Sequence, residues 1–368
     1  MKVALVYDRV NKFGGAERVL LALHEIWPEA PLYTSVYEPN KAPWASVFEV
    51  RTSFLQKLPL PKDRHELYPF LMGRAFETFN FDQFDVVVSV THEFSKAIIT
   101  KPQTVHLCYC LNPVGYLWAN YEDYFSHKST AYRLLTMPLI RYLRWYDQIV
   151  CFRPDQYVAI SKTVQERIRN YYGQESAVIY PPIESQKKNE ILSPAFGGLQ
   201  NDIKKGRDYF LIVSRLVPNK RIDIAVEAFN ALGWPLVIIG VGIEEQRLKS
   251  LAKNNIQFLG GLTDEQLASY YRSCRAFVIP GEEDFGITAV EAQSFGKPVI
   301  AFGKGGVTET VIEGKTGLFF SEQTAGPLIS SLEAFVRWQF DPKKCQQNAQ
   351  KFSKERFKQE FQTYINNL

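Results

Sequence analysis

The chain has 368 residues, of which 46% are hydrophobic and 22% charged, and its formal net charge is +4 at pH 7. This length is too great for one ordinary hydrophobic core and predicts two domains of about 150 to 180 residues each. The composition excludes fibrous and disordered classes of protein, and so small a net charge does not favour a nucleic-acid partner.

The first half of the chain alternates short apolar runs with helical patterns. It begins with a predicted strand at Val3–Tyr7, whose apolar run stops at Asp8, too early for a signal peptide. A helix is predicted at Ala16–Trp27. The alternation predicts a parallel sheet with helices on both faces. Further strands are predicted at Val86–Val90, Val105–Tyr109, Tyr157–Ile160 and Val178–Tyr180, and a further helix at Thr163–Tyr172.

Residues 128–153 combine five Lys or Arg residues with many apolar side chains and one acid, Asp147. This mixture suits a helix in a membrane interface, with its basic residues on anionic lipid headgroups at the inner face of the plasma membrane. It suits equally a helix whose apolar side packs on the first domain and whose arginines are solvated. The basic residues are Lys128, Arg133, Arg141, Arg144 and Arg153.

The five cysteines and the lengths of the apolar runs bear on location. The cysteines are odd in number and have no C-x-x-C or zinc-ribbon spacing, which predicts a reduced, cytoplasmic protein. No apolar run reaches the roughly 18 residues that a membrane-spanning helix needs, so any membrane contact is expected to be peripheral.

Polar residues 185–206, which follow Tyr180-Pro-Pro-Ile-Glu, are predicted to link a domain of residues 1–184 to one of residues 207–342. Residues 343–368 are predicted to form an amphipathic helix that packs on its own domain or crosses back to the first. In the second domain, strands are predicted at Tyr209–Ser214, Leu236–Gly240, Ile256–Leu259, Ala276–Ile279, Val299–Ala301 and Gly317–Phe319, and helices near Ile222–Ala231, Glu244–Lys253, Asp264–Ser273, Gly286–Phe295 and Val307–Ile312.

The most informative segment runs from Pro280 to Ala292, after a predicted strand and into a predicted helix. The start of this helix should lie at the carboxyl edge of the sheet, where α/β proteins bind ligands and where helix amides favour anions. Glu283 and Glu291 flank these amides, and carboxylates suit the vicinal hydroxyls of sugars. The alternative is a capped surface helix with solvated acids.

Two further segments lie at predicted strand ends. Arg215 ends one strand and Lys220 starts the next helix, an arrangement suited to two cations that hold a diphosphate. Gly14 and Gly15 follow the first strand, where their backbone can approach a phosphate or sugar closely. For the two glycines, an ordinary turn at the start of a helix is the alternative.

Taken together and in this order, these motifs resemble glycosyltransferase family 4. The resemblance implies the GT-B fold, an α/β fold with two Rossmann-like domains facing each other across a cleft. Two segments, at residues 52–59 and 109–118, resemble bacterial mannosyltransferases of O-antigen, capsule and exopolysaccharide assembly. The other motifs are G-G-A-E-R-V-L from Gly14, Y-P-P-I from Tyr180, S-R-L-x-x-x-K from Ser214, I-G-V-G-I from Ile239, F-L-G-x-L-x-D-E-x-L from Phe258, E-x₇-E from Glu283 and G-G-V-T-E from Gly305.

The resemblance implies roles for individual residues. Arg215 and Lys220 would bind the donor diphosphate and offset the charge that develops on the leaving nucleotide. Glu283 would hold the hydroxyls of the donor sugar, and Glu291 the ribose. Because cations and helix dipoles replace the metal in this family, neither a metal nor another cofactor is expected. The backbone positions implied in donor binding are Gly14, Gly15, Gly240, Leu262, Phe285, Gly286 and Ile287, with Leu262 near the base.

One motif departs from the family pattern. In the mannosyltransferases it resembles, Y-C-x-x-P usually reads Y-C-H-T-P, often with an arginine two residues after the proline; this chain has Leu111 and Gly115 there. Since Leu cannot donate a hydrogen bond to a sugar, His92, in a loop after a strand, is the candidate catalytic replacement. An ordinary loop residue is the alternative for His92. His106, at the start of its strand, is interpreted as structural.

The resemblance therefore implies a retaining enzyme that transfers a hexose, mannose first, from a GDP- or UDP-sugar to a glycan or lipid-linked glycan acceptor. The second domain would bind the donor and the first the acceptor. Two other functions stay open. A nucleotide-sugar 2-epimerase shares this fold but needs carboxylates in the first half that no motif identifies. A non-catalytic sugar-nucleotide-binding subunit is motivated by Leu111 and Gly115.

Overall fold

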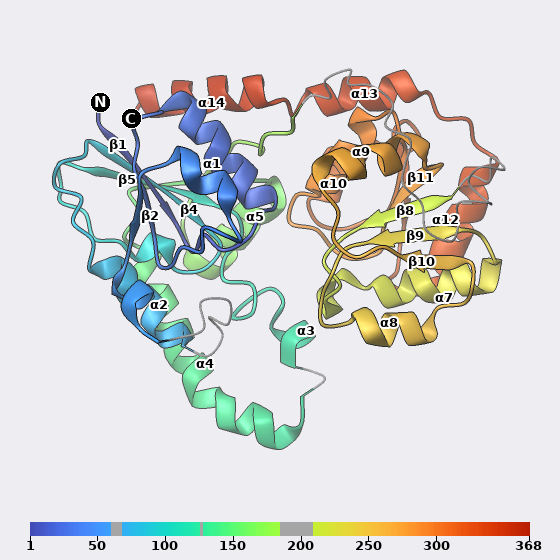
Figure 1. Cartoon of the computed structure of the whole chain (residues 1–368), viewed down its shortest axis with the longest axis horizontal. Helices are drawn as coiled ribbons and strands as arrows, with labels where there is room; N and C mark the ends of the chain where they lie inside the picture. The colour runs from blue at the N-terminus through green and yellow to red at the C-terminus, as the bar shows by residue number, and fades with distance from the viewer. Residues whose placement is uncertain (60–67, 126–127, 185–208) are drawn as a thin grey trace. The chain divides into compact units, whose positions relative to one another are not determined.

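The computed structural model describes residues 1–59, 68–125, 128–184 and 209–368. It forms two compact units (Figure 1). Unit 1 contains Met1–Pro182 together with Lys354–Leu368, and unit 2 contains Ile183–Ser353. The linker predicted at 185–206 lies outside the described residues.

Unit 1 is built on a seven-stranded parallel sheet with the order β3-β2-β1-β4-β5-β6-β7. Every residue of β1 and β4 is buried, as expected for strands covered on both faces. The chain moves outward from β1 to β3 and then returns to β4 on the other side of β1, so the order reverses between β1 and β4. The strands are β1 (Val3–Tyr7), β2 (Leu32–Thr34), β3 (Val50–Thr52), β4 (Val86–Thr91), β5 (Val105–Cys110), β6 (Gln156–Ala159) and β7 (Ala177–Val178).

The helices of unit 1 have recognisable ends. Ser129 and Ser161 accept backbone N–H bonds at the starts of α4 and α5, and Gly173, with a φ of 63°, ends α5 in the left-handed conformation. The α-helices are α1 (Gly15–Ile26), α2 (Pro69–Glu77), α3 (Tyr121–Phe125), α4 (Thr130–Val150), α5 (Lys162–Tyr172) and α14 (Lys354–Asn366), and the 3₁₀ helices are η1 (Pro43–Val47), η2 (Phe54–Lys57) and η4 (Ser95–Ala97).

Unit 2 repeats the arrangement with a six-stranded parallel sheet in the order β10-β9-β8-β11-β12-β13, which reverses between β8 and β11. Alternate residues of its strands enter separate cores: Phe210 and Ile212 belong to one apolar cluster and Leu211 to the other. Side chains of a strand alternate between its two faces, so both faces of this sheet are covered. The strands are β8 (Phe210–Val213), β9 (Leu236–Ile239), β10 (Ile256–Phe258), β11 (Ala276–Ile279), β12 (Val299–Phe302) and β13 (Gly317–Phe320).

The helices of unit 2 follow its strands. They are η5 (Pro218–Lys220), α7 (Ile222–Leu232), α8 (Glu245–Leu251), α9 (Asp264–Ser273), α10 (Ile287–Ser294), α11 (Val307–Thr310), α12 (Ala325–Val336) and α13 (Pro342–Gln350). The predicted α/β class with two doubly wound sheets is confirmed. Among the described residues, no helix has the length and apolarity to cross a membrane.

The prediction of one helix over residues 343–368 is wrong. The segment forms two helices, α13 and α14, separated near Phe352. In unit 2, α13 packs on α10, where Asn348 donates a hydrogen bond of 2.8 Å to Gln293 Oε1. In unit 1, α14 lies along α1 (Figure 1). The Phe357 and Phe361 side chains of α14 pack on Tyr109. The apolar residues at helical spacing therefore serve two different cores.

Candidate active site

The predicted donor residues of unit 2 lie where the strand order reverses. In parallel α/β sheets, ligands bind at the carboxyl ends of the strands beside such a point. Arg215 follows β8, Lys220 ends η5 in the same connection, and Glu283 follows β11, the neighbour of β8. Arg215 is exposed, whereas Lys220 and Glu283 are partly buried.

Lys220 and Glu283 are in direct contact. Lys220 Nζ donates a hydrogen bond of 2.7 Å to Glu283 Oε2, and the two side chains are 13% and 19% exposed. The connections that carry them touch at Gly281, where an added Cβ would lie 2.8 Å from Lys220 Cα. A side chain at position 281 would therefore push the two loops apart. The structure thus brings together a cation and a carboxylate that are 63 residues apart in the sequence.

Gly305 and Gly306 also contact the Glu283 loop. Gly306 N donates to Glu283 O over 2.7 Å. A Cβ on Gly305 would lie 2.5 Å from Glu283 O, and one on Gly306 would lie 2.3 Å from the carbonyl oxygen of Asp284. Only glycine permits this close backbone approach, so the G-G turn from Gly305 sets the position of the loop.

The start of α10 follows this loop. Gly286 is its N-cap, with a φ of 84° that favours glycine, and the helix begins at Ile287. The first amides of a helix have no partner within it and can receive an anion or a hydroxyl group. The Phe285 side chain is 3% exposed and packs edge-on against Phe352, which anchors the entry to the helix.

Three other predicted donor residues lie in unit 2. Glu291, on α10, is 9% exposed and accepts a hydrogen bond of 3.0 Å from the Tyr271 hydroxyl of α9. Leu262, between β10 and α9, is half-buried against an apolar cluster. Gly240 has a φ of 144°, and a Cβ there would lie 1.9 Å from the carbonyl oxygen of Ser214. Packing alone therefore requires glycine at position 240, and the donor-binding roles of these residues stay predictions.

Gly14 and Gly15 lie at the start of α1 in unit 1. Gly14 is extended, with a φ of −174°, so its backbone conformation does not call for glycine. A Cβ on Gly14 would lie 3.3 Å from Glu17 Oε2. The Glu17 carboxylate is buried and accepts a hydrogen bond of 2.6 Å from the Tyr7 hydroxyl. The Tyr7–Glu17 hydrogen bond connects the first turn of α1 to the end of β1.

His92 follows β4, at the point where the strand order of unit 1 reverses, and its side chain is half-buried. The groups around it belong to none of the predicted sites. Arg9 Nη1 contacts Glu93 Oε2 at 2.7 Å, and both side chains are largely buried. Burial lowers the pKa of Arg9, but the Glu93 carboxylate more than offsets this and raises it above its ordinary value. In the sequence, only the position of Arg9 and Glu93 shortly after the strands β1 and β4 could have marked them as site residues.

His106 lies in the core, as its structural interpretation requires. It is fully buried in β5, and its Nε2 lies 2.8 Å from Ser89 Oγ. Burial lowers the pKa of His106 to about 3, so the imidazole is neutral at physiological pH. Leu111 follows the same strand and donates its backbone N–H to Thr91 O over 2.8 Å.

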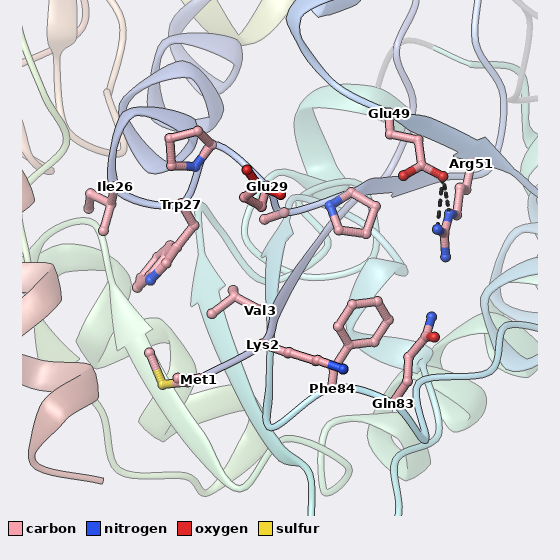
Figure 2. Close-up of a pocket in the computed structure, with 13 residues that line it drawn as sticks. Met1, Lys2, Val3, Ile26, Trp27, Glu29, Glu49, Arg51, Gln83 and Phe84 are labelled. Atoms are coloured by element: carbon pink, nitrogen blue, oxygen red, sulfur yellow. Dashed lines mark hydrogen bonds and ion pairs between the residues drawn. The ribbon is translucent and has the colours of Figure 1, made fainter.

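A hollow of about 410 Å³ lies at the opposite, amino edge of the unit 1 sheet (Figure 2). Its lining includes Val3 at the start of β1, Trp27 after α1 and Phe84 before β4, together with the Glu49–Arg51 ion pair. None of the predicted site residues lines it. Within the described residues, no group of three or more His, Cys, Asp or Glu side chains is arranged to hold a metal ion.

The chain is similar in sequence to known glycosyltransferases. Residues 199–352 match the family model of glycosyl transferases group 1. The chain is 25% identical to an alpha-1,3/1,6-mannosyltransferase of Dictyostelium discoideum over 81% of this chain and 77% of that protein. It is 30% identical to a GDP-mannose-dependent alpha-(1-6)-phosphatidylinositol monomannoside mannosyltransferase of Mycobacterium tuberculosis over 43% of this chain and 46% of that protein.

The alignments with several curated relatives span about half of the relative's length, with shares of 58%, 49% and 46%. Among solved structures, Anabaena HepE in complex with UDP and glucose matches with a TM-score of 0.73 and 19% identity over the whole of both chains. Residues 199–352 are therefore similar to group 1 glycosyl transferases, and the two units have the fold of the GT-B glycosyltransferases.

Proposed function

We propose that this protein is a retaining, metal-independent glycosyltransferase that moves a hexose, mannose first, from a GDP- or UDP-sugar to a glycan or lipid-linked glycan. The observation that carries the proposal is the contact of 2.7 Å between Lys220 and Glu283, where the sheet order of unit 2 reverses. Arg215 lies in the same connection as Lys220. Relatives named as mannosyltransferases support the choice of sugar. HepE, solved with UDP, supports a nucleotide-sugar donor.

The geometry suits chemistry in which a diphosphate leaves the sugar. As the bond from the sugar C1 to the phosphate oxygen breaks, negative charge grows on the diphosphate, and Arg215 and Lys220 provide the stabilising cations. The Glu283 carboxylate, oriented by Lys220, can accept hydrogen bonds from the sugar hydroxyls. The acceptor oxygen then attacks C1 from the face that the phosphate leaves, and its proton passes to the departing phosphate oxygen, which retains the anomeric configuration.

A nucleotide screen followed by a transfer assay tests this function. A ligand at about 100 times its Kd should stabilise the folded state by about 2.7 kcal/mol, so GDP, UDP and their hexose derivatives can be ranked by thermal shift. The best donor is then incubated with and without glycan and lipid-linked acceptors. Formation of a sugar epimer without acceptor would indicate an epimerase instead. Donor binding with no turnover on any acceptor would indicate a non-catalytic subunit.

Metal removal should leave the activity intact. Arg215 and Lys220 supply positive charge at the proposed diphosphate site, so a divalent cation has no necessary place there. We expect the same kcat with donor and acceptor before and after treatment with excess EDTA. Loss of activity that magnesium or manganese restores would contradict the metal-independent mechanism.

We place the proposed membrane contact on the first half of α4. Here Leu134 and Leu135 are 60% and 80% exposed, and Tyr132 and Met137 are also exposed. Figure 1 shows this half of the helix extending away from the sheet of unit 1. The apolar side chains would enter the interface of an anionic membrane, with most of the protein in the cytoplasm.

The basic residues of the segment divide into two groups. Arg144 donates to Leu117 O over 2.8 Å and lies over the Trp118 and Tyr121 rings, and Arg153 binds Glu77 at 2.6 Å. These two arginines therefore stabilise unit 1 and are poorly placed for lipid headgroups. Arg141 is exposed and, with Lys128 and Arg133, can provide the electrostatic part of the contact.

Replacing Leu134 and Leu135 together by Glu should weaken binding to anionic vesicles at least about tenfold, because burial of each leucine contributes about 1.5 kcal/mol or more. Binding of the original protein should also decline with salt. Co-sedimentation with phosphatidylglycerol vesicles measures both effects. The matched control is Leu251→Glu, a leucine of α8 that is 50% exposed. No binding at low salt, or an unchanged double variant, would exclude this surface.

A further inference from the structure

Asp8 organises the turn after β4. This residue directly follows β1 and is 2% exposed. Its Oδ2 accepts the backbone N–H groups of His92 and Glu93 at 2.7 and 2.9 Å, and its Oδ1 accepts those of Phe94 and Ser95 at 2.9 and 2.7 Å. A carboxylate that accepts four backbone bonds holds the chain in one conformation. The partners are 84 to 87 residues away in the sequence.

Other bonds hold the same turn. Ser95 Oγ donates to Val90 O over 3.0 Å, and Lys96 Nζ donates to Glu93 O over 2.8 Å. The Glu93 side chain is engaged by Arg9. Between Val86 and Ile98, His92 is the one residue that is not buried. The result of all these bonds is a rigid turn that offers a single side chain, the imidazole of His92, at the carboxyl edge of the sheet.

His92 lies next to Leu111 at the ends of two paired strands. In the register of β4 and β5, Thr91 pairs with Cys110, so the next residues along the two strands are His92 and Leu111. The bond from Leu111 N to Thr91 O continues this pairing. Leu111 has no group that can hydrogen-bond a sugar, and the neighbouring strand end supplies an imidazole instead.

We infer that Asp8 is a positioning residue for glycosyl transfer, which acts by fixing the turn that presents His92 to the acceptor. This inference rests on the proposed function. Errors of about 1 Å in the placement of a catalytic group can lower the rate about a hundredfold. A carboxylate is needed at position 8, because an Asn amide would turn its N–H₂ group toward two of the four backbone N–H donors.

A double-mutant cycle with Asp8→Asn and His92→Gln tests the inference. Each single variant should lower kcat at least about tenfold and leave the donor KM unchanged. If Asp8 acts through His92, the double variant should be no slower than His92→Gln alone. The matched control is Asp85→Asn, an aspartate of unit 1 that accepts one backbone N–H bond and is 65% exposed. Its kcat should be normal.

Additive effects of the two substitutions would overturn the inference, and so would normal kcat in His92→Gln. If Asp8→Asn does not fold, Asp8→Glu, which displaces the carboxylate but keeps its charge, enters the same cycle. If the unsubstituted protein has no transferase activity, the proposed function itself is contradicted. The NMR signal of the His92 imidazole, assigned through His92→Gln, separates the two failures: it should broaden in Asp8→Asn, and an unchanged signal would contradict positioning by Asp8.

Discussion

Replacement of Lys220 by Ala should lower kcat by a factor of about 10² to 10³, the effect of removing one group that stabilises charge in a transition state. The loss should appear at saturating donor, because the cation is needed most as charge grows on the departing diphosphate. Glu283→Gln should have an effect of similar size, since it removes the carboxylate that lies 2.7 Å from Lys220 Nζ. It also weakens the proposed hydrogen bonds from the sugar hydroxyls to residue 283. Steady-state kinetics with saturating donor and acceptor measures both effects.

The same unit contains a control ion pair. Lys249 and Glu245 of α8 are 2.7 Å apart, with side chains 50% and 27% exposed. Lys249→Ala removes an equal charge from a helix that carries none of the predicted site residues, and it should leave kcat unchanged. Arg215→Ala should lower kcat at least about tenfold without a change in unfolding temperature. Normal rates in both Lys220→Ala and Arg215→Ala would show that the diphosphate binds elsewhere.

Replacement of Lys96 by Met should lower the free energy of unfolding by about 3 to 5 kcal/mol, because it leaves the Asp147 charge buried without its cation. The two side chains are 1% and 0% exposed and lie 2.7 Å apart. Asp147 also accepts hydrogen bonds from Trp118 at 2.7 Å and Tyr172 at 2.9 Å. Burial lowers the pKa of Lys96, but Asp147 reverses this and raises it above its usual range, so the lysine is charged.

Urea denaturation of Lys96→Met, Asp147→Leu and the double variant measures this effect. The double variant should lose less than the sum of the single losses, because it removes both charges together. Lys101→Met is the control: its partner Asp82 is 45% exposed, and exposed pairs contribute about 0 to 1 kcal/mol. A loss below about 1 kcal/mol in Lys96→Met would mean that the buried pair does not stabilise unit 1.

The sequence alone determined the fold class and most of the second unit. Most strands of unit 2 are unbroken apolar runs, and the helices between them have a helical periodicity, so the elements could be located from local patterns. The helix predicted at Asp264–Ser273 has the same bounds in the structure, where Thr263 and Gln266 form its capping box. Lys220 and Glu283 could be selected because both follow buried strands.

Short and partly exposed elements escaped the sequence analysis. β2 and β3 have three residues each, and β3 is only half-buried, so neither has an apolar run long enough to distinguish a strand from a loop. Their place in the sheet depends on pairing with β1 and with each other. The break between α13 and α14 was missed for a related reason, since helical spacing does not reveal that neighbouring turns bury their side chains in different cores.

Only the tertiary structure decided which of the chemically active residues meet. The sequence located His92 after a strand and Asp8 at the end of another, but it did not reveal that one carboxylate binds the turn that carries the imidazole. Nor did it pair Lys96 with Asp147, or show that Arg144 hydrogen-bonds to Leu117 O within unit 1. Local patterns specify secondary structure because backbone geometry repeats over a few residues. Contacts between distant residues depend on strand order and register, which are set by the packing of the whole sheet.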